Sequence, residues 1–228
     1  MLPVPPALQA QDLPHEASVR KQRDLWLDVA RNSKHDVEAW HKVAEFELRL
    51  GNPDGAIAAE DRAIGMFPKY AVAYATRARA HFDKRDFAAA RADASKVIEL
   101  LEAKGGFQKY LDVERPPEHY LASYRLRGLA YAWERQWDAA FRDLAAAVKL
   151  SPDDVALEVE RATLFEKAGR PRDAIASRLR AGLLSADAGM KGRAEEQAAA
   201  LRKLGAAKEA GEVEAKLASR KRKSDLPD

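Results

Sequence analysis

The side chains best suited to chemistry in this sequence are arginines and aromatic residues spaced for one face of a helix. Arg79 lies three residues before Phe82, and Arg125 lies eight residues before Trp133. Residues separated by about one or two helical turns share a face of an α-helix. Arginine binds carboxylates through paired hydrogen bonds, and arginine and tryptophan are common anchors of protein interfaces. The chemistry that these residues offer is therefore recognition of another protein.

Sequence motifs for catalysis or metal binding are absent. The chain has no Gly-Lys dipeptide, which the usual phosphate-binding loop requires, no Gly-x-Ser-x-Gly and no His-Glu-x-x-His. The chain has no cysteine, which excludes disulfides, thiol catalysis and cysteine-based metal sites. The five histidines lack metal-ligand spacing; they are His15, His35, His41, His81 and His119. We therefore expect no enzyme activity, no cofactor and no metal.

Composition predicts an all-helical chain. The 228 residues are 46% hydrophobic, 33% charged and only 7% aromatic, with alanine runs at 88–90 and 145–147. Alanine and most charged residues favour helix, and few segments have the β-branched content typical of strands. No apolar run approaches the roughly 18 residues that span a bilayer.

A period of 34 residues organises the centre of the sequence. Four successive units carry small residues at two equivalent positions, namely Ala44 and Ala56, Ala78 and Ala90, Gly128 and Ala140, Ala162 and Ala174. The second and third units are offset by 50 residues, because about 16 extra residues lie between them. Small residues at facing positions let two helices approach closely, so each unit is predicted to be a helix pair.

The third unit has the most specific pattern: Arg127 to Tyr131, then Asp138 to Ala140, then Leu150 to Pro152. This pattern resembles the tetratricopeptide repeat family. The resemblance implies an all-α fold, a right-handed α-solenoid of helix hairpins with capping helices and a concave groove. The four repeats would span residues 35–69, 70–103, 119–153 and 154–187, with an insertion at 104–118.

The ends of the chain are predicted to cap this stack or to be disordered. Residues 15–34 are expected to form an N-terminal capping helix, and 188–219 two further capping helices, because a solenoid must cover its terminal apolar faces. The proline-rich segment 1–14 and the basic tail 220–228 are predicted to be disordered. The four basic residues Arg220 to Lys223 exceed the net charge of +3, so the rest of the chain is close to neutral. A near-neutral body does not suit a broad nucleic-acid interface.

The resemblance implies a partner-binding groove along the first helix of each pair. Helical spacing places six candidate residues there: His41, Glu45, Arg79, Phe82, Arg125 and Trp133. The arginines would meet acidic groups of the partner, and the aromatic residues would supply apolar area. Two other interpretations remain open: the arginines are solvated surface residues, and the aromatic rings pack between neighbouring units.

Taken together, the sequence predicts a non-catalytic scaffold or adaptor that binds another protein or peptide. A homo-oligomeric scaffold is one alternative, and an accessory protein tethered to nucleic acid or a membrane by its basic tail is another. No small-molecule substrate is expected. Met1 to Pro6 lack the features of an intact signal peptide. We expect a soluble cytoplasmic protein, or a periplasmic or exported one if a signal peptide was removed.

Overall fold

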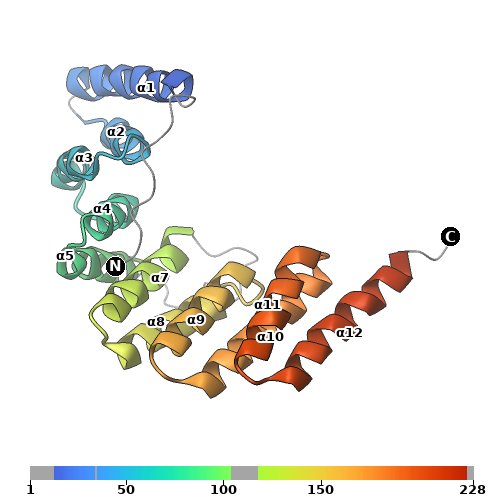
Figure 1. Cartoon of the computed structure of the whole chain (residues 1–228). Helices are drawn as coiled ribbons and strands as arrows, with labels where there is room; N and C mark the ends of the chain where they lie inside the picture. The colour runs from blue at the N-terminus through green and yellow to red at the C-terminus, as the bar shows by residue number, and fades with distance from the viewer. Residues whose placement is uncertain (1–12, 34, 104–117, 225–228) are drawn as a thin grey trace. The chain divides into compact units, whose positions relative to one another are not determined.

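The computed structural model describes residues 13–33, 35–103 and 118–224, and all regular secondary structure within them is helical (Figure 1). The helices run, in order, α1 Leu13–Asn32, α2 Val37–Arg49, α3 Pro53–Met66, α4 Ala71–Asp83, α5 Phe87–Glu102, α7 Glu118–Trp133, α8 Trp137–Leu150, α9 Val155–Lys167, α10 Pro171–Asp187, α11 Lys191–Lys203 and α12 Ala207–Ser224. The predicted all-α repeat fold is confirmed. None of these helices is long and apolar enough to cross a membrane.

The helices belong to two compact units, Met1–Ala130 and Tyr131–Asp228. The boundary lies within α7, so the first unit holds α1 to α5 and most of α7. The second unit holds the last turn of α7 and α8 to α12.

Side-chain caps begin four helices in the part of the chain that the structure describes. An aspartate or asparagine accepts a hydrogen bond from a backbone N–H of the first turn, which would otherwise have no partner in the helix. The four cap residues are Asp36, Asn52, Asp86 and Asp154. Pro53 and Pro171 stand in the first turn of α3 and α10, where a missing N–H costs nothing.

Successive helices form pairs, and one residue with a left-handed backbone conformation lies in the turn after the first helix of each pair, namely after α2, α4, α7, α9 and α11. Its φ is +69° at Gly51, +63° at Arg85, +57° at Arg135, +69° at Gly169 and +77° at Gly205. Glycine takes this conformation freely, whereas a residue with a Cβ does so at a cost. Two of the five turns therefore hold an arginine where glycine would be relaxed.

Alanine dominates the core of the first unit. A buried cluster joins α1, α2, α3 and α4 through Ala30, Ala39, Val43, Ala44, Ala56, Ala59 and Ala80. Trp26, Trp40 and Leu48 pack against it. The small side chains let the helix axes lie close together, and the larger side chains fill the space at the edges of this cluster.

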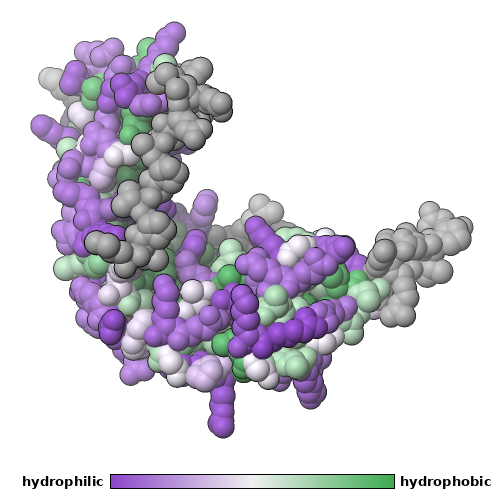
Figure 2. Space-filling view, viewed as in Figure 1, coloured by the Kyte–Doolittle hydropathy of each residue, from purple (hydrophilic) through white to green (hydrophobic). Residues whose placement is uncertain are grey.

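The core of the second unit extends to α12. Its buried cluster consists of Ala186, Ala194, Ala198, Leu201, Ala206, Ala210 and Val213. Gly182 on α10 allows a close approach, because a Cβ there would lie 2.6 Å from a methyl group of Val213. Hydrophilic side chains cover much of the visible surface, with small apolar patches between them (Figure 2).

Two predicted boundaries differ from the structure, and three predicted segments lie wholly or partly outside the described residues. α12 continues to Ser224, so residues 220–224 are helical where the sequence predicts a disordered tail. Lysine and arginine are good helix formers, and the first helix-breaking residue after them is Pro227. Likewise α1 begins at Leu13, two residues before the predicted start. Residues 1–12, insertion residues 104–117 and residues 225–228 lie outside the described residues.

Candidate protein-binding surface

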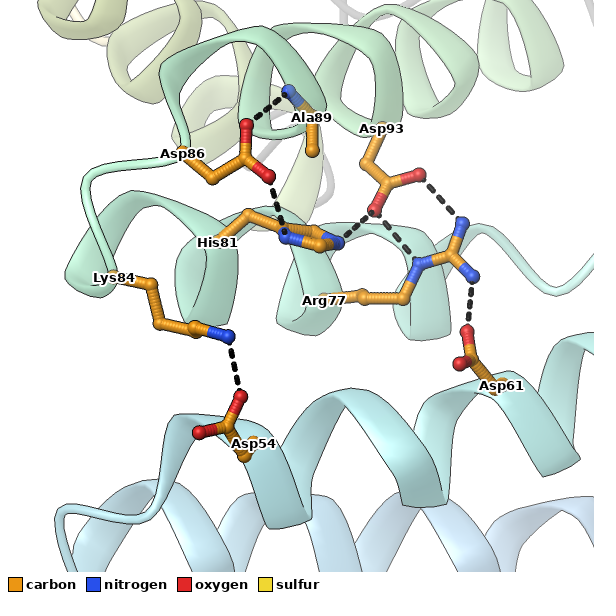
Figure 3. A network of polar contacts seen from close by, with 8 residues as sticks. All are labelled: Asp54, Asp61, Arg77, His81, Lys84, Asp86, Ala89 and Asp93. Atoms are coloured by element: carbon orange, nitrogen blue, oxygen red, sulfur yellow. Dashed lines mark hydrogen bonds and ion pairs between the residues drawn. The ribbon is translucent and has the colours of Figure 1, made fainter.

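Arg77 connects three helices of the first unit (Figure 3). From α4 it donates two hydrogen bonds to Asp93 on α5, at 2.8 Å and 2.7 Å, and one to Asp61 on α3, at 2.5 Å. The hydrogen bonds that Arg77 donates to Asp93 outweigh the effect of burial and raise the pKa of the Arg77 guanidinium above its ordinary value. The Arg77 side chain therefore stays charged and holds the α4–α5 pair to α3, the second helix of the preceding pair.

Other residues on or next to α4 make further polar contacts near Arg77. Nδ1 of His81 lies 3.8 Å from Asp86, and its Nε2 lies 3.9 Å from Asp93. Asp86 also accepts a hydrogen bond from the backbone N–H of Ala89, which caps α5. Lys84 at the end of α4 forms an ion pair with Asp54 on α3. Figure 3 shows these contacts spread along α4, so the helix is fixed at more than one point.

Arg79 and Phe82 lie on this anchored helix. The Arg79 side chain is 64% exposed, and its Nε lies 2.9 Å from Asp83, one turn along α4. Phe82 is half-buried, and its ring meets the Phe87 ring edge-on with a centroid distance of 5.4 Å. Arg79 is thus presented to solvent, whereas Phe82 packs within its own helix pair.

His41 is not presented to solvent. It is only 6% exposed, and its Nδ1 lies 2.7 Å from Oε1 of Glu60, a fully buried carboxyl on α3. Helical spacing alone does not predict that the Glu60 side chain reaches across from α3 and covers His41. His41 is therefore a contact within the pair, and it is removed from the candidate surface.

Glu60 is a fully buried carboxylic acid that the sequence pattern does not single out. Burial raises the pKa of its carboxyl, and the hydrogen bond with His41 opposes this only in part. Its Oε2 has no hydrogen-bond partner within the described residues. In the sequence Glu60 follows the apolar run Ala56 to Ala59 and stands directly before Asp61, so nothing in the pattern distinguishes it from a solvated acid.

Glu45 is half-buried one turn after His41. It accepts a hydrogen bond of 2.7 Å from Lys42 and lies 3.8 Å from Nε2 of His41. Burial alone would raise the pKa of the Glu45 carboxyl, but the Lys42 hydrogen bond and nearby positive charges outweigh it and lower the pKa. Glu45 is thus a negative group on α2.

Arg125 and Trp133 both lie on α7 but fall in different units. Arg125 is exposed in the first unit, and Trp133 is 47% exposed at the end of α7 in the second. Together with Arg79, Arg125 gives the first unit two exposed guanidinium groups on first helices of pairs. Trp133 belongs to the second unit and does not contribute to this pair of arginines.

The structural role of Arg77 recurs in a second arginine at the repeat spacing, which the sequence pattern could have indicated. Arg127 occupies the position of Arg77 one unit later, 50 residues along the chain. It donates a 2.9 Å hydrogen bond to Ser95 on α5, and its guanidinium lies 5.5 Å from the centre of the Tyr124 ring. Arg77 lies over Tyr74 in the same way, at 5.4 Å. The recurrence at the repeat spacing was the available signal.

These helix pairs form an all-helical repeat fold of the kind found in tetratricopeptide repeat proteins. Among solved structures, the chain is similar to PilW, a type IV pilus biogenesis factor, at 19% identity and a TM-score of 0.65 over 92% of this chain and 89% of that one. It is similar to MamA from Desulfovibrio magneticus RS-1, at 16% identity and a TM-score of 0.62 over 77% and 90% of the two chains. It is also similar to YrrB, described as a TPR protein with an unusual peptide-binding site, at 15% identity and a TM-score of 0.57 over 84% and 90%.

No protein-family model matches the sequence, and no curated protein matches it. At identities this low, the structural similarities establish the fold.

Proposed function

We propose that the chain is a non-catalytic scaffold that binds a peptide or helix of a partner protein through Arg79 and Arg125. The observation that carries this proposal is the exposed guanidinium of Arg79 on a helix whose Arg77 is bonded to α3 and α5. A binding group on an immobilised helix loses little conformational entropy when a partner arrives.

The internal partner of Arg79 does not prevent this role. Its ion pair with Asp83 is exposed, and exposed pairs contribute only about 0–1 kcal/mol. A partner carboxylate that makes two parallel hydrogen bonds to the guanidinium would be preferred once water is excluded. Acidic groups on a peptide or helix are therefore the expected targets.

The similar structures support the same class of function. YrrB is described by its peptide-binding site, and PilW as a type IV pilus biogenesis factor. Both descriptions suit proteins that hold other proteins. For this chain, the role as a protein-binding scaffold and the lack of catalysis are proposals.

Affinity purification from native extract tests the proposal. We expect the double variant Arg79→Glu, Arg125→Glu to lose a protein that the natural chain retains. The matched control is Arg62→Glu, Arg172→Glu, which makes the same charge change at two exposed positions elsewhere. A photo-crosslinking residue at Ala75, one turn before Arg79, should attach to the same protein. Identical captures by both double variants would refute the binding surface.

Self-association is a second candidate, suggested by α1. Leu25 is 59% exposed and Val29 is 42% exposed, one turn apart on this helix. Apolar side chains adjacent on a terminal helix suit a contact with another copy. Light scattering across a range of concentrations tests it: the mass should rise with concentration, and the variant Leu25→Glu, Val29→Glu should stay monomeric.

A further inference from the structure

A surface pocket of about 540 Å³ lies in the second unit, where the α7–α8 turn meets the α9–α10 turn. Its walls include three arginines, Arg135, Arg142 and Arg170, with Trp137 and a single acid, Asp138. Positive charge therefore exceeds negative charge within one hollow. The pocket contains none of the residues in the proposed binding surface of the first unit.

Stacked aromatic rings support the pocket. Trp137 stacks on Phe141 at 6.2 Å between ring centres, and Phe141 stacks on Phe165 at 4.0 Å. The Arg170 guanidinium lies 5.1 Å and 5.2 Å from the centres of the Phe141 and Phe165 rings. Its Nε also donates to Asp173 at 2.8 Å. Arg170 is thus held in place, and the half-buried ring of Trp137 offers an apolar wall.

Arg135 is held in an unfavourable backbone conformation. Its φ of +57° is at the turn position where three of the other four pairs have glycine. Within the described residues, the guanidinium of Arg135 makes no ion pair, and Arg142 makes one hydrogen bond, from Nε to the backbone oxygen of Asp138 at 3.3 Å. Both side chains remain able to bind an anionic group.

We infer that this pocket binds an acidic segment of a partner protein. Carboxylates of the segment would bond to Arg135 and Arg142, with Arg170 adding charge and Trp137 packing against the peptide. Arginine is suited to this, because its planar fork matches a carboxylate. The pocket also covers the first turn of α8, where Gln136 makes no side-chain cap and backbone N–H groups favour an anion.

The charge distribution favours a peptide over a nucleic acid. The positive charge is concentrated in one pocket, whereas a nucleic acid is held by a row of phosphate contacts along an extended basic surface. Outside the four basic residues near its end, the chain is close to neutral. A short acidic segment fits a compact pocket of this kind.

Arg85 provides a matched control within the same chain. It has the same left-handed conformation in the α4–α5 turn, with φ of +63°. Asp86 and Ala92 stand there at the positions of Gln136 and Arg142, so that turn has an acid after its left-handed arginine and no counterpart of Arg142. Replacing Arg85 therefore repeats the backbone change without touching the pocket.

Fluorescence anisotropy of a labelled hexaglutamate peptide tests the inference on the full chain. We expect the variant Arg135→Gly, Arg142→Glu to bind about tenfold more weakly, which corresponds to about 1.4 kcal/mol. The control variant Arg85→Gly, Arg62→Glu has the same net charge and should bind within about twofold of the natural chain. Circular dichroism checks that each variant remains helical.

Three results would overturn the inference. The two double variants could lose affinity equally, which would show only a general charge effect. The natural chain could bind hexaglutamine as well as hexaglutamate, which would exclude carboxylate recognition. A single-stranded oligonucleotide could bind more tightly than the peptide and be lost in the same variant, which would assign the pocket to phosphates. None of these results bears on Arg79 and Arg125, so the proposed function is tested separately.

Discussion

Replacing Arg77 with methionine should be among the most destabilising changes in the first unit. The substitution keeps the length of the side chain but removes three hydrogen bonds to Asp93 and Asp61. Asp93 is only 9% exposed, so it becomes a buried carboxylate without its main partner. Removing one member of a buried ion pair costs about 3–5 kcal/mol. Because His81 still lies 3.9 Å from Asp93, we expect a loss of about 3 kcal/mol, the lower end of that range.

The two carboxylates should differ in their contribution. Asp61 is 55% exposed, so Asp61→Asn should cost no more than about 1 kcal/mol. Asp93→Asn leaves Arg77 facing a neutral amide and should cost more than Asp61→Asn. The double variant Arg77→Met, Asp93→Asn should lose less than the sum of the single changes, because the second substitution removes the stranded charge.

Urea unfolding followed by circular dichroism measures these differences. The slope of the unfolding free energy against urea should stay the same, so that a shifted midpoint reports stability alone. A loss below about 1 kcal/mol for Arg77→Met would contradict the buried-pair argument. Equal effects of Asp61→Asn and Asp93→Asn would contradict the role given to burial.

Three further predictions concern other parts of the structure. Burial raises the pKa of the Glu60 carboxyl, so its favourable contribution is present below the ordinary value of 4.5 and is lost as the pH rises through the raised value. Glu60→Gln should therefore gain stability relative to the natural chain as the pH increases from below 4.5 to neutral; a constant difference in urea midpoint would exclude this. Arg85→Gly and Arg135→Gly should each stabilise by about 0.5–1 kcal/mol, because glycine removes the left-handed strain. Lower melting temperatures for both would show that the arginine side chains stabilise more than the strain costs. Gly182→Ala should cost about 1–3 kcal/mol through contact with Val213, whereas Gly65→Ala, which meets nothing within 4 Å, should not destabilise. Similar melting temperatures for these two variants would disprove the close approach of α10 and α12.

The helical repeat fold could be predicted from the sequence because close packing requires small residues at fixed positions. Ala44, Ala78 and Ala162 are fully or almost fully buried, as their recurrence at the repeat spacing indicates. The polar contacts within the pairs could not be predicted in the same way. Helical spacing says which face of α2 His41 occupies, but its burial depends on Glu60 from another helix.

The charged groups show the same limit. From the sequence alone, a charged residue at the position of Arg77 would not be expected in a packed interface between helices. The structure resolves this, because Asp93 and Asp61 reach Arg77 from the neighbouring helices. The pocket of the second unit also depends on tertiary structure, because Arg135 and Arg170 come from turns that are far apart in the sequence. The candidate binding residues Glu45, Arg79, Phe82, Arg125 and Trp133 remain predictions.

The three hydrogen bonds of Arg77 also determine how the first unit opens. In a repeat protein, each unit contacts only its neighbours, and segments can unfold locally with separate free energies. Arg77 opposes such independent opening, because unfolding of α4 breaks its bonds to Asp93 on α5 and to Asp61 on α3 at the same time. The backbone amides of α3, α4 and α5 should therefore exchange with deuterium as one cooperative group. A partner bound at Arg79 would then slow exchange in two helices that it need not touch.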